Sequence, residues 1–191
     1  MFSTLRPSIR DIERFLEVSR DLPLSYEPAG LAQNAHGAFD ADQAIVALGS
    51  GAVVYERAKG ALRDWTQFNL GWVELYPRHA SIEIGSVVAV VIRHFGFWSM
   101  NGCRVVYGIG HDAATEFGFA YGTLSNHAEC GEEVFKVVMT PETGEVFYVI
   151  RAASRPRAAL ARVGYPLVRL LQARFRRDSG RVMQQAAGRI V

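Results

Sequence analysis

Short apolar runs separated by turn residues dominate the chain from Trp72 onward. The predicted strands are Trp72–Tyr76, Ser86–Phe95, Cys103–Ile109, Phe117–Leu124, Glu132–Met139 and Val146–Ala153. Asn101-Gly102 and Thr143-Gly144 are dipeptides of the kind that close antiparallel hairpins. No helical segment interrupts the series. The pattern therefore predicts a six-stranded antiparallel meander and excludes a parallel doubly wound sheet.

Helical spacing of apolar residues precedes the meander. It predicts a first helix over Ser8–Asp21 and a second helix that follows a brief strand at Gln43–Leu48, with Ser50 as its N-cap. The second helix carries an apolar stripe of Val54, Ala58, Leu62, Trp65 and Phe68. Residues 24–42 show no sustained period, so we expect a connector there.

A long helix is predicted after Ser154-Arg155-Pro156, running to about Asp178 and bending at Gly164 and Pro166. Its apolar side holds Leu160, Val163, Leu167, Leu171 and Phe175, with Arg162, Arg169 and Arg176 in a stripe on the opposite side. Arg174 projects into the apolar side, where a guanidinium requires a buried carboxylate or a ligand anion. Residues 180–191 are expected to form a frayed basic end.

Length and composition fit one soluble globular unit. The 191 residues are 49% hydrophobic and 21% charged, enough for one well-filled core. We expect an N-terminal helical extension at 1–23, a single α+β domain at 24–179 and a basic tail at 180–191. No apolar run approaches the ~20 residues of a membrane-spanning helix. The first residues lack the apolar core of a secretion signal, so a cytoplasmic location is expected.

The net charge of +2 hides an asymmetry. Residues 151–191 carry ten arginines and one acid, a net charge of +9, whereas residues 1–150 carry eleven Lys and Arg against eighteen acids, a net charge of −7. Two explanations of this charge asymmetry are possible. The basic segment is attracted to the acidic part of the same chain, or it binds an anionic membrane surface or nucleic acid. The basic segment contains no lysine, which favours the internal explanation and disfavours nucleic acid.

The segment 117–135 contains most of the candidate functional side chains. Large side chains at Phe117, Phe119 and Tyr121 alternate with Gly118, Ala120 and Gly122, so one face of this strand is bulky and the other is bare backbone that something must approach closely. The polar segment that follows contains His127, Glu129, Glu132 and Glu133. On an extended chain His127, Glu129 and Glu133 share a face, and Glu132 points away.

No cofactor is indicated by these residues. The Gly49-Ser50-Gly51 turn lacks the third glycine of a dinucleotide fingerprint, since Val54 stands there. One histidine and nearby glutamates on a single segment are a weak signal for a metal site, and we expect none. Cys103 and Cys130 are expected to be reduced, buried thiols, and no catalytic nucleophile is evident.

The element order and several motifs resemble known families. A curved meander wrapped around a C-terminal helix resembles the helix-grip architecture of the START and pollen-allergen superfamily. The segments GSGAVVYERAKGALRDW, CRVVY, FGFAYGTLSNHAECGEEVF and SRP resemble the uncharacterised "domain of unknown function nineteen-ninety" family of bacteria and plants over about 24–178. The first resemblance implies an apolar cavity between sheet and helix, and the second implies no established activity.

We therefore expect a small apolar or amphipathic molecule to bind between the sheet and the last helix. The candidate ligand-binding residues are Tyr121, His127, Glu129, Glu133, Arg155, Arg174 and Trp98. Glu133 is expected to form an internal ion pair with Arg174, Arg151 or Arg155.

Two alternatives remain open. One is an enzyme of the cyclase or hydratase kind that uses His127 and Glu133 as acid and base in the same cavity. The other is a surface-interaction protein that docks on an anionic membrane surface or nucleic acid through Arg162, Arg169 and Arg176.

Overall fold

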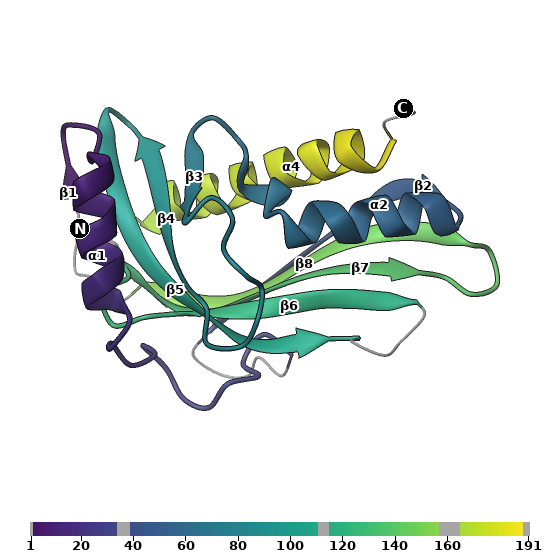
Figure 1. Ribbon diagram of the computed structural model, residues 1–191, viewed down its shortest axis with the longest axis horizontal. Helices are drawn as coiled ribbons and strands as arrows, with labels where there is room; N and C mark the ends of the chain where they lie inside the picture. Colours follow the sequence, from purple (N-terminus) through teal and green to yellow (C-terminus); the bar gives the residue numbers. More distant parts are fainter. Residues whose placement is uncertain (1, 34–38, 111–114, 157–164, 189–191) are drawn as a thin grey trace.

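A computed structural model describes residues 2–33, 39–110, 115–156 and 165–188 as an α+β fold (Figure 1). The strands are β1 (Phe2–Ser3), β2 (Asp40–Ser50), β3 (Val73–Tyr76), β4 (Val87–His94), β5 (Phe97–Ile109), β6 (Glu116–Thr123), β7 (Glu129–Met139) and β8 (Glu145–Pro156). The helices are α1 (Ile9–Ser19), α2 (Ala52–Arg63), the 3-10 turn η1 (Thr66–Phe68) and α4 (Tyr165–Gly188). None of the helices described is long and apolar enough to cross a lipid bilayer.

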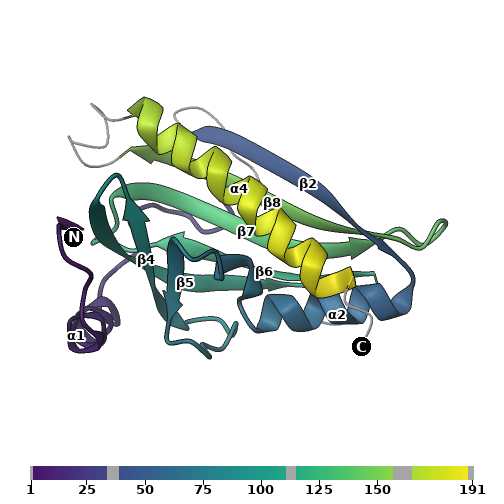
Figure 2. The same cartoon turned by 90° about the horizontal axis from the view of Figure 1, so that it is seen from above.

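The strands form one antiparallel sheet in the order β2-β8-β7-β6-β5-β4-β3, with β1 added beside β5. Strands β3 to β8 are the predicted meander, and each pairs with its neighbour in sequence. The sheet curls, and α2 and α4 lie on its concave face (Figures 1 and 2). The predicted helix-grip arrangement, a curved sheet around a C-terminal helix, is therefore confirmed. Pairing of β2 with the last strand, β8, was not predicted.

Two of the predicted boundaries between strands and helices are wrong because backbone pairing overrides local residue preference. Asn101-Gly102 lies inside β5, where Asn101 pairs with Val90, and the β4–β5 connection instead uses Phe95-Gly96 with φ of 49° and 82°. Ser50 pairs with Glu145 at the end of β2 and is not a cap, so Gly51, with φ of 91°, precedes α2. The predicted Thr143-Gly144 turn does connect β7 and β8, with Gly144 at φ of 68°.

The last helix ends later than predicted, and its described part begins at Tyr165. Ser154-Arg155-Pro156 is the end of β8, where Ser154 pairs with Gly131, and is not a helix cap. Helix α4 continues to Gly188, so residues 180–188 are helical and not the frayed end that was expected. Met183 and Ala187 are fully buried in the main core, which explains why the helix extends beyond Asp178.

The main core lies between the concave face of the sheet and helices α2 and α4. Its centre is a group of aromatic rings: Trp65, Phe68, Phe119, Tyr121, Phe135 and Phe175. The bulky face predicted at Phe117, Phe119 and Tyr121 is the face that packs here. Burial of such rings contributes most of the apolar surface removed from water.

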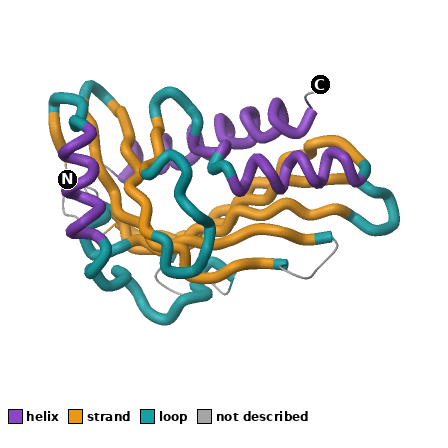
Figure 3. The backbone as a smooth tube through the Cα atoms, in the orientation of Figure 1, coloured by secondary structure: helices purple, strands orange, loops and turns teal. Residues whose placement is uncertain are grey.

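Helix α1 lies apart from α2 and α4, beside β4 and β5 (Figure 3). Its N-terminus is a capping box in which the Asp11 backbone N–H donates to Ser8 and the Ser8 backbone N–H donates to Asp11. Ile12 and Leu16 pack in a second apolar cluster with residues of β4 and β5. Trp98 packs against this cluster and does not line the cavity between the sheet and α4, so its position does not support the predicted ligand-binding role.

Residues 22–33 cross the face of the sheet opposite α2 and α4 (Figure 1). Gly122 permits this approach, because a Cβ there would stand 2.3 Å from Tyr26 Oη and 2.9 Å from a Leu24 methyl. The bare face predicted for this strand is thus occupied by the chain itself. Glu132, only 2% exposed, anchors the segment by accepting hydrogen bonds from Tyr26 Oη, Tyr107 Oη and two backbone N–H groups.

Candidate functional site

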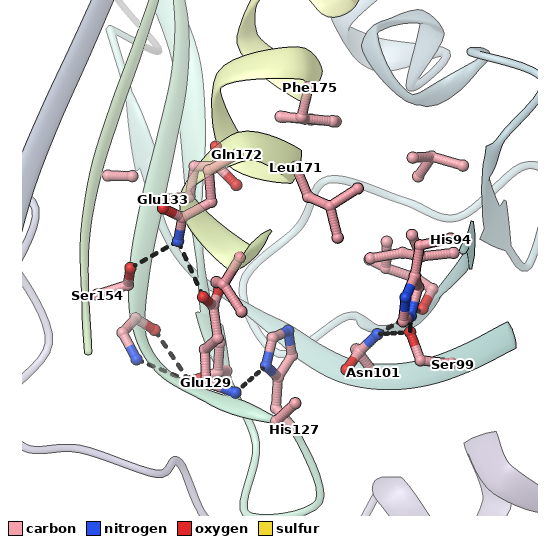
Figure 4. A pocket seen from close by; sticks show the side chains of 18 of the residues that line it. His94, Ser99, Asn101, His127, Glu129, Glu133, Ser154, Leu171, Gln172 and Phe175 are labelled. Atoms are coloured by element: carbon pink, nitrogen blue, oxygen red, sulfur yellow. Dashed lines mark hydrogen bonds between the residues drawn. The ribbon is translucent and has the colours of Figure 1, made fainter. Parts of the chain in front are cut away.

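A cavity of about 340 Å³ lies between the concave face of the sheet and the first half of α4. Most of its wall is apolar and includes Phe68, Trp72, Val73, Val90, Ile92, Phe95, Leu167, Val168, Leu171 and Phe175. One polar group, from the β6–β7 turn, β7, β8 and α4, contains His127, Glu129, Glu133, Ser154 and Gln172, and a smaller one from β4 and β5 contains His94, Ser99 and Asn101 (Figure 4). This combination of apolar walls and few polar groups is typical of a small-molecule site.

His127 is fixed by the tight turn between β6 and β7. Its backbone N–H donates to Leu124 O at 3.0 Å, and its ring Nδ1 accepts from the Glu129 backbone N–H at 2.9 Å. Burial lowers the pKa of His127 to about 3, so the ring is neutral and its proton is on Nε2. A neutral ring with that pKa is a poor acid or base near neutral pH, which argues against the predicted catalytic use of His127.

Glu129 links the sheet to α4. Its Oε1 accepts a hydrogen bond from Gln172 Nε2 at 2.9 Å, and the same Gln172 nitrogen donates to Ser154 Oγ at 3.1 Å (Figure 4). Burial raises the pKa of Glu129, although the hydrogen bond from Gln172 opposes that shift. Gln172 thereby fixes one carboxyl of the cavity to a side chain of the helix.

Glu133 lies on the same face of β7, four residues further along the strand. Its Oε2 accepts from Tyr121 Oη at 2.8 Å. Burial raises the pKa of Glu133 to about 7, with the nearby Glu129 adding to the shift. The expected ion pair is wrong, because no arginine of the described residues lies within ion-pair distance of this carboxyl. Tyr121 is its partner instead.

The arginines of α4 are arranged opposite to the prediction. Arg174 is 45% exposed, pairs with Asp178 at 3.4 Å and stacks over the Trp72 ring at 4.3 Å. Arg176 lines the cavity with a side chain only 16% exposed, and both Arg176 and Arg169 pair with Asp42 of β2. These ion pairs lower the pKa of Asp42.

Of the three arginines predicted to lie in a stripe opposite the apolar side, Arg169 and Arg176 pair with Asp42 and are partly buried, and Arg162 lies outside the described residues. Leu171 and Phe175 of the predicted apolar side do pack against the main core, and the buried side continues through Ser179 and Met183, beyond the predicted end of the helix. Gln172 and Arg176 border this side and line the cavity. Leu160 and Val163 lie outside the described residues.

Arg155 does not reach the cavity. Its side chain is exposed, and its guanidinium stacks over the Phe39 ring at 4.7 Å. On β8 the neighbouring Ala152 and Ser154 line the cavity, so the alternation of the strand turns Arg155 to the other face. Of the predicted residues, the structure brings together Tyr121, His127, Glu129 and Glu133 and leaves out Arg155, Arg174 and Trp98.

The sequence did contain a signal for the residues that were missed on α4. Val168, Gln172 and Arg176 recur at a spacing of four, which is one line along a helix. The sequence pattern predicts a strand from Cys103 to Ile109, whereas β5 begins at Phe97. Ser99 and Asn101 therefore lay outside the predicted strand and were not recognised as candidates.

Neither cysteine supplies a nucleophile. Both are buried and unpaired, as expected for reduced thiols. Burial raises the pKa of Cys103, and the nearby carboxyls of Glu133 and Glu129 add to that effect, so the thiolate is disfavoured. Across the described ranges, no three His, Cys, Asp or Glu side chains are grouped to hold a metal ion.

The sequence of this chain matches a known protein family. The family described as "Domain of unknown function (DUF1990)" matches residues 25–182. A UPF0548 protein of Dictyostelium discoideum is 31% identical over 208 residues, which cover 98% of this chain and 96% of that protein.

Two solved structures are similar in fold. The protein TTHA0849 of Thermus thermophilus has a TM-score of 0.52 at 12% identity over 78% of this chain and 97% of that one. The Zhui aromatase/cyclase of Streptomyces sp. R1128 has a TM-score of 0.51 at 12% identity over 78% of this chain and 93% of that one. At this identity the likeness shows the fold alone, which is the helix-grip fold expected from the sequence.

Proposed function

Because the chain belongs to the DUF1990 family, whose description assigns no activity, we propose from the cavity itself that the protein binds a small amphipathic molecule between its sheet and α4. The observation that carries the proposal is a cavity of about 340 Å³ with aromatic and aliphatic walls and two partly unsatisfied carboxyls on one side. Its volume falls in the range of small-molecule sites. One protein of similar fold is an aromatase/cyclase, which supports the proposal by analogy only.

Native mass spectrometry of gently purified protein tests this function. We expect a stoichiometric small molecule that is released on denaturation. In Leu171→Trp the larger ring occupies the cavity, so the released amount should fall at least tenfold. The matched control is Leu170→Trp, since Leu170 is the next residue on α4, is 60% exposed and does not line the cavity. Equal loss in both variants, or an empty wild-type protein with no thermal shift in a lipid and aromatic panel, contradicts the proposal.

Glu133 supports a second function, proton transfer to or from the bound molecule. A carboxyl with a pKa of about 7 can accept and donate a proton near neutral pH. The released molecule serves as the substrate: we expect it to change chemically when returned to the protein, and Glu133→Gln to slow that change at least a hundredfold even when the molecule saturates the site. An unchanged molecule leaves binding as the function.

Docking on an anionic membrane surface or nucleic acid through Arg162, Arg169 and Arg176 is less favoured by the structure. Arg169 and Arg176 pair with Asp42 and are partly buried, and Arg162 lies outside the described residues.

A further inference from the structure

The cavity presents hydrogen-bond acceptors that the protein leaves open. Glu129 and Glu133 each use one carboxyl oxygen, for Gln172 Nε2 and Tyr121 Oη respectively. Within the described parts of the chain, the other oxygen, Oε2 of Glu129 and Oε1 of Glu133, accepts no hydrogen bond, and both residues line the cavity. Neither oxygen is fully buried, so both are accessible from the cavity, and a ligand that supplies a hydrogen-bond donor would pair with them.

The nearby guanidinium groups do not meet this need. Arg169 donates through both NH1 and NH2 to the Asp42 carboxyl, and Arg176 NH1 lies 3.3 Å from Asp42 Oδ2. Among the described residues, three carboxyl groups, of Asp42, Glu129 and Glu133, therefore face two guanidinium groups. With both glutamates ionised, the described groups at this end of the cavity carry one more negative than positive charge.

The adjoining wall of the cavity is aromatic. The rings of Phe68, Tyr121 and Phe175 all line the cavity and lie close together, with centroids 6.0 Å apart for Phe68 and Tyr121 and 5.2 Å apart for Phe68 and Phe175. Aromatic faces attract cations, and the attraction is larger where water is excluded. The Trp72 ring already has a cation, that of Arg174.

We propose that the molecule bound in this cavity is an amphipathic amine, whose ammonium group donates to the open carboxyl oxygens of Glu129 and Glu133 and whose apolar part packs against α4. This inference rests on the proposed function and narrows it to a ligand class. A fatty acid or other anionic amphiphile is excluded from the same place, because its carboxylate would lie against two like charges.

Isothermal titration with three probes of one chain length, octylamine, octanol and octanoate, tests the ligand class. At pH 8, above the pKa of Glu133 of about 7, the amine is protonated and the carboxyls are ionised. We expect octylamine to bind at least tenfold more tightly than octanol, and octanoate to bind most weakly. Glu133→Gln and Glu129→Gln keep the side-chain shape and remove the charge, so each should weaken octylamine at least tenfold and change octanol less than threefold.

The outcomes separate the two proposals. If octanol or octanoate binds as tightly as octylamine, or if both glutamine variants retain the affinity for octylamine, the amine class is wrong while cavity binding stands. If none of the three probes binds to wild-type protein and Leu171→Trp also loses nothing in mass spectrometry, cavity binding itself fails. Melting curves of the two variants establish that any loss comes from a folded protein.

Discussion

We expect Glu132→Ala to lower the free energy of unfolding by about 4 kcal/mol. Glu132 accepts from Tyr26 Oη at 2.6 Å, from Tyr107 Oη at 2.7 Å and from the backbone N–H groups of Gly30 and Ala32 at 2.9 and 3.1 Å. Hydrogen bonds to a charged group contribute about 1.5–3 kcal/mol each, and their loss leaves buried donors unpaired. The four losses are coupled, so we expect less than their sum.

Chemical denaturation followed by tryptophan fluorescence measures this effect. Glu142→Ala is the matched control, because Glu142 lies on the exposed turn before β8 and its removal should change stability by less than about 0.5 kcal/mol. Hydrogen exchange gives a second readout: residues 22–33 should lose protection in Glu132→Ala more than the strands do. A loss of under about 1 kcal/mol, with unchanged exchange in 22–33, would mean that Glu132 does not anchor that segment.

The second prediction has the opposite sign: Glu133→Gln should stabilise the ligand-free protein at high pH. In the folded protein the pKa of Glu133 is about 7, against an ordinary value of 4.5. Between these values the folded state binds more protons than the unfolded state, so the stability due to Glu133 is present at low pH and is lost as pH rises through 7. The full shift corresponds to about 3 kcal/mol, and water in the cavity should reduce this to about 2 kcal/mol.

Denaturation of wild-type and Glu133→Gln protein at pH 4 and pH 8 checks the prediction. The difference in the free energy of unfolding should grow by about 2 kcal/mol in favour of the variant between the two pH values, since the glutamine can still accept the hydrogen bond of Tyr121. Glu142→Gln, which removes an exposed charge, serves as the control for a general charge effect. A difference that stays constant with pH would show that the Glu133 carboxyl is as well solvated in the folded state as in the unfolded chain.

The contrast between the two neighbouring glutamates shows how the site is built. Glu132 points to the outer face, where the chain supplies its donors and the carboxyl stabilises the fold. Glu133 points into the cavity, where Tyr121 supplies one donor and no other donor from the described residues reaches its second oxygen. Burial without full satisfaction is a cost that binding of a suitable ligand would offset.

The sequence by itself determined the features that depend on neighbouring residues. Alternation at Phe117, Phe119 and Tyr121 identified the face that packs in the core, and it identified Gly122 on the face that another part of the chain approaches. The same period of two placed Glu129 and Glu133 together and turned Glu132 away. Such patterns are local because the direction of a side chain on a strand depends only on its position in that strand.

Only the tertiary structure decided which elements pack together, in which register the strands pair and which side chains of a helix are buried. Asn101-Gly102 has the composition of a turn but lies in β5, because pairing with β4 secures its backbone hydrogen bonds. The surroundings of the α4 arginines depended on residues far away in the chain, since Arg176 pairs with Asp42 of β2 and Arg174 stacks over Trp72. The hydrogen bond of Glu133 likewise depended on strand pairing, because its donor, Tyr121, lies opposite it on β6. Register and helix rotation arise from contacts between residues far apart in the chain, and no local period records them.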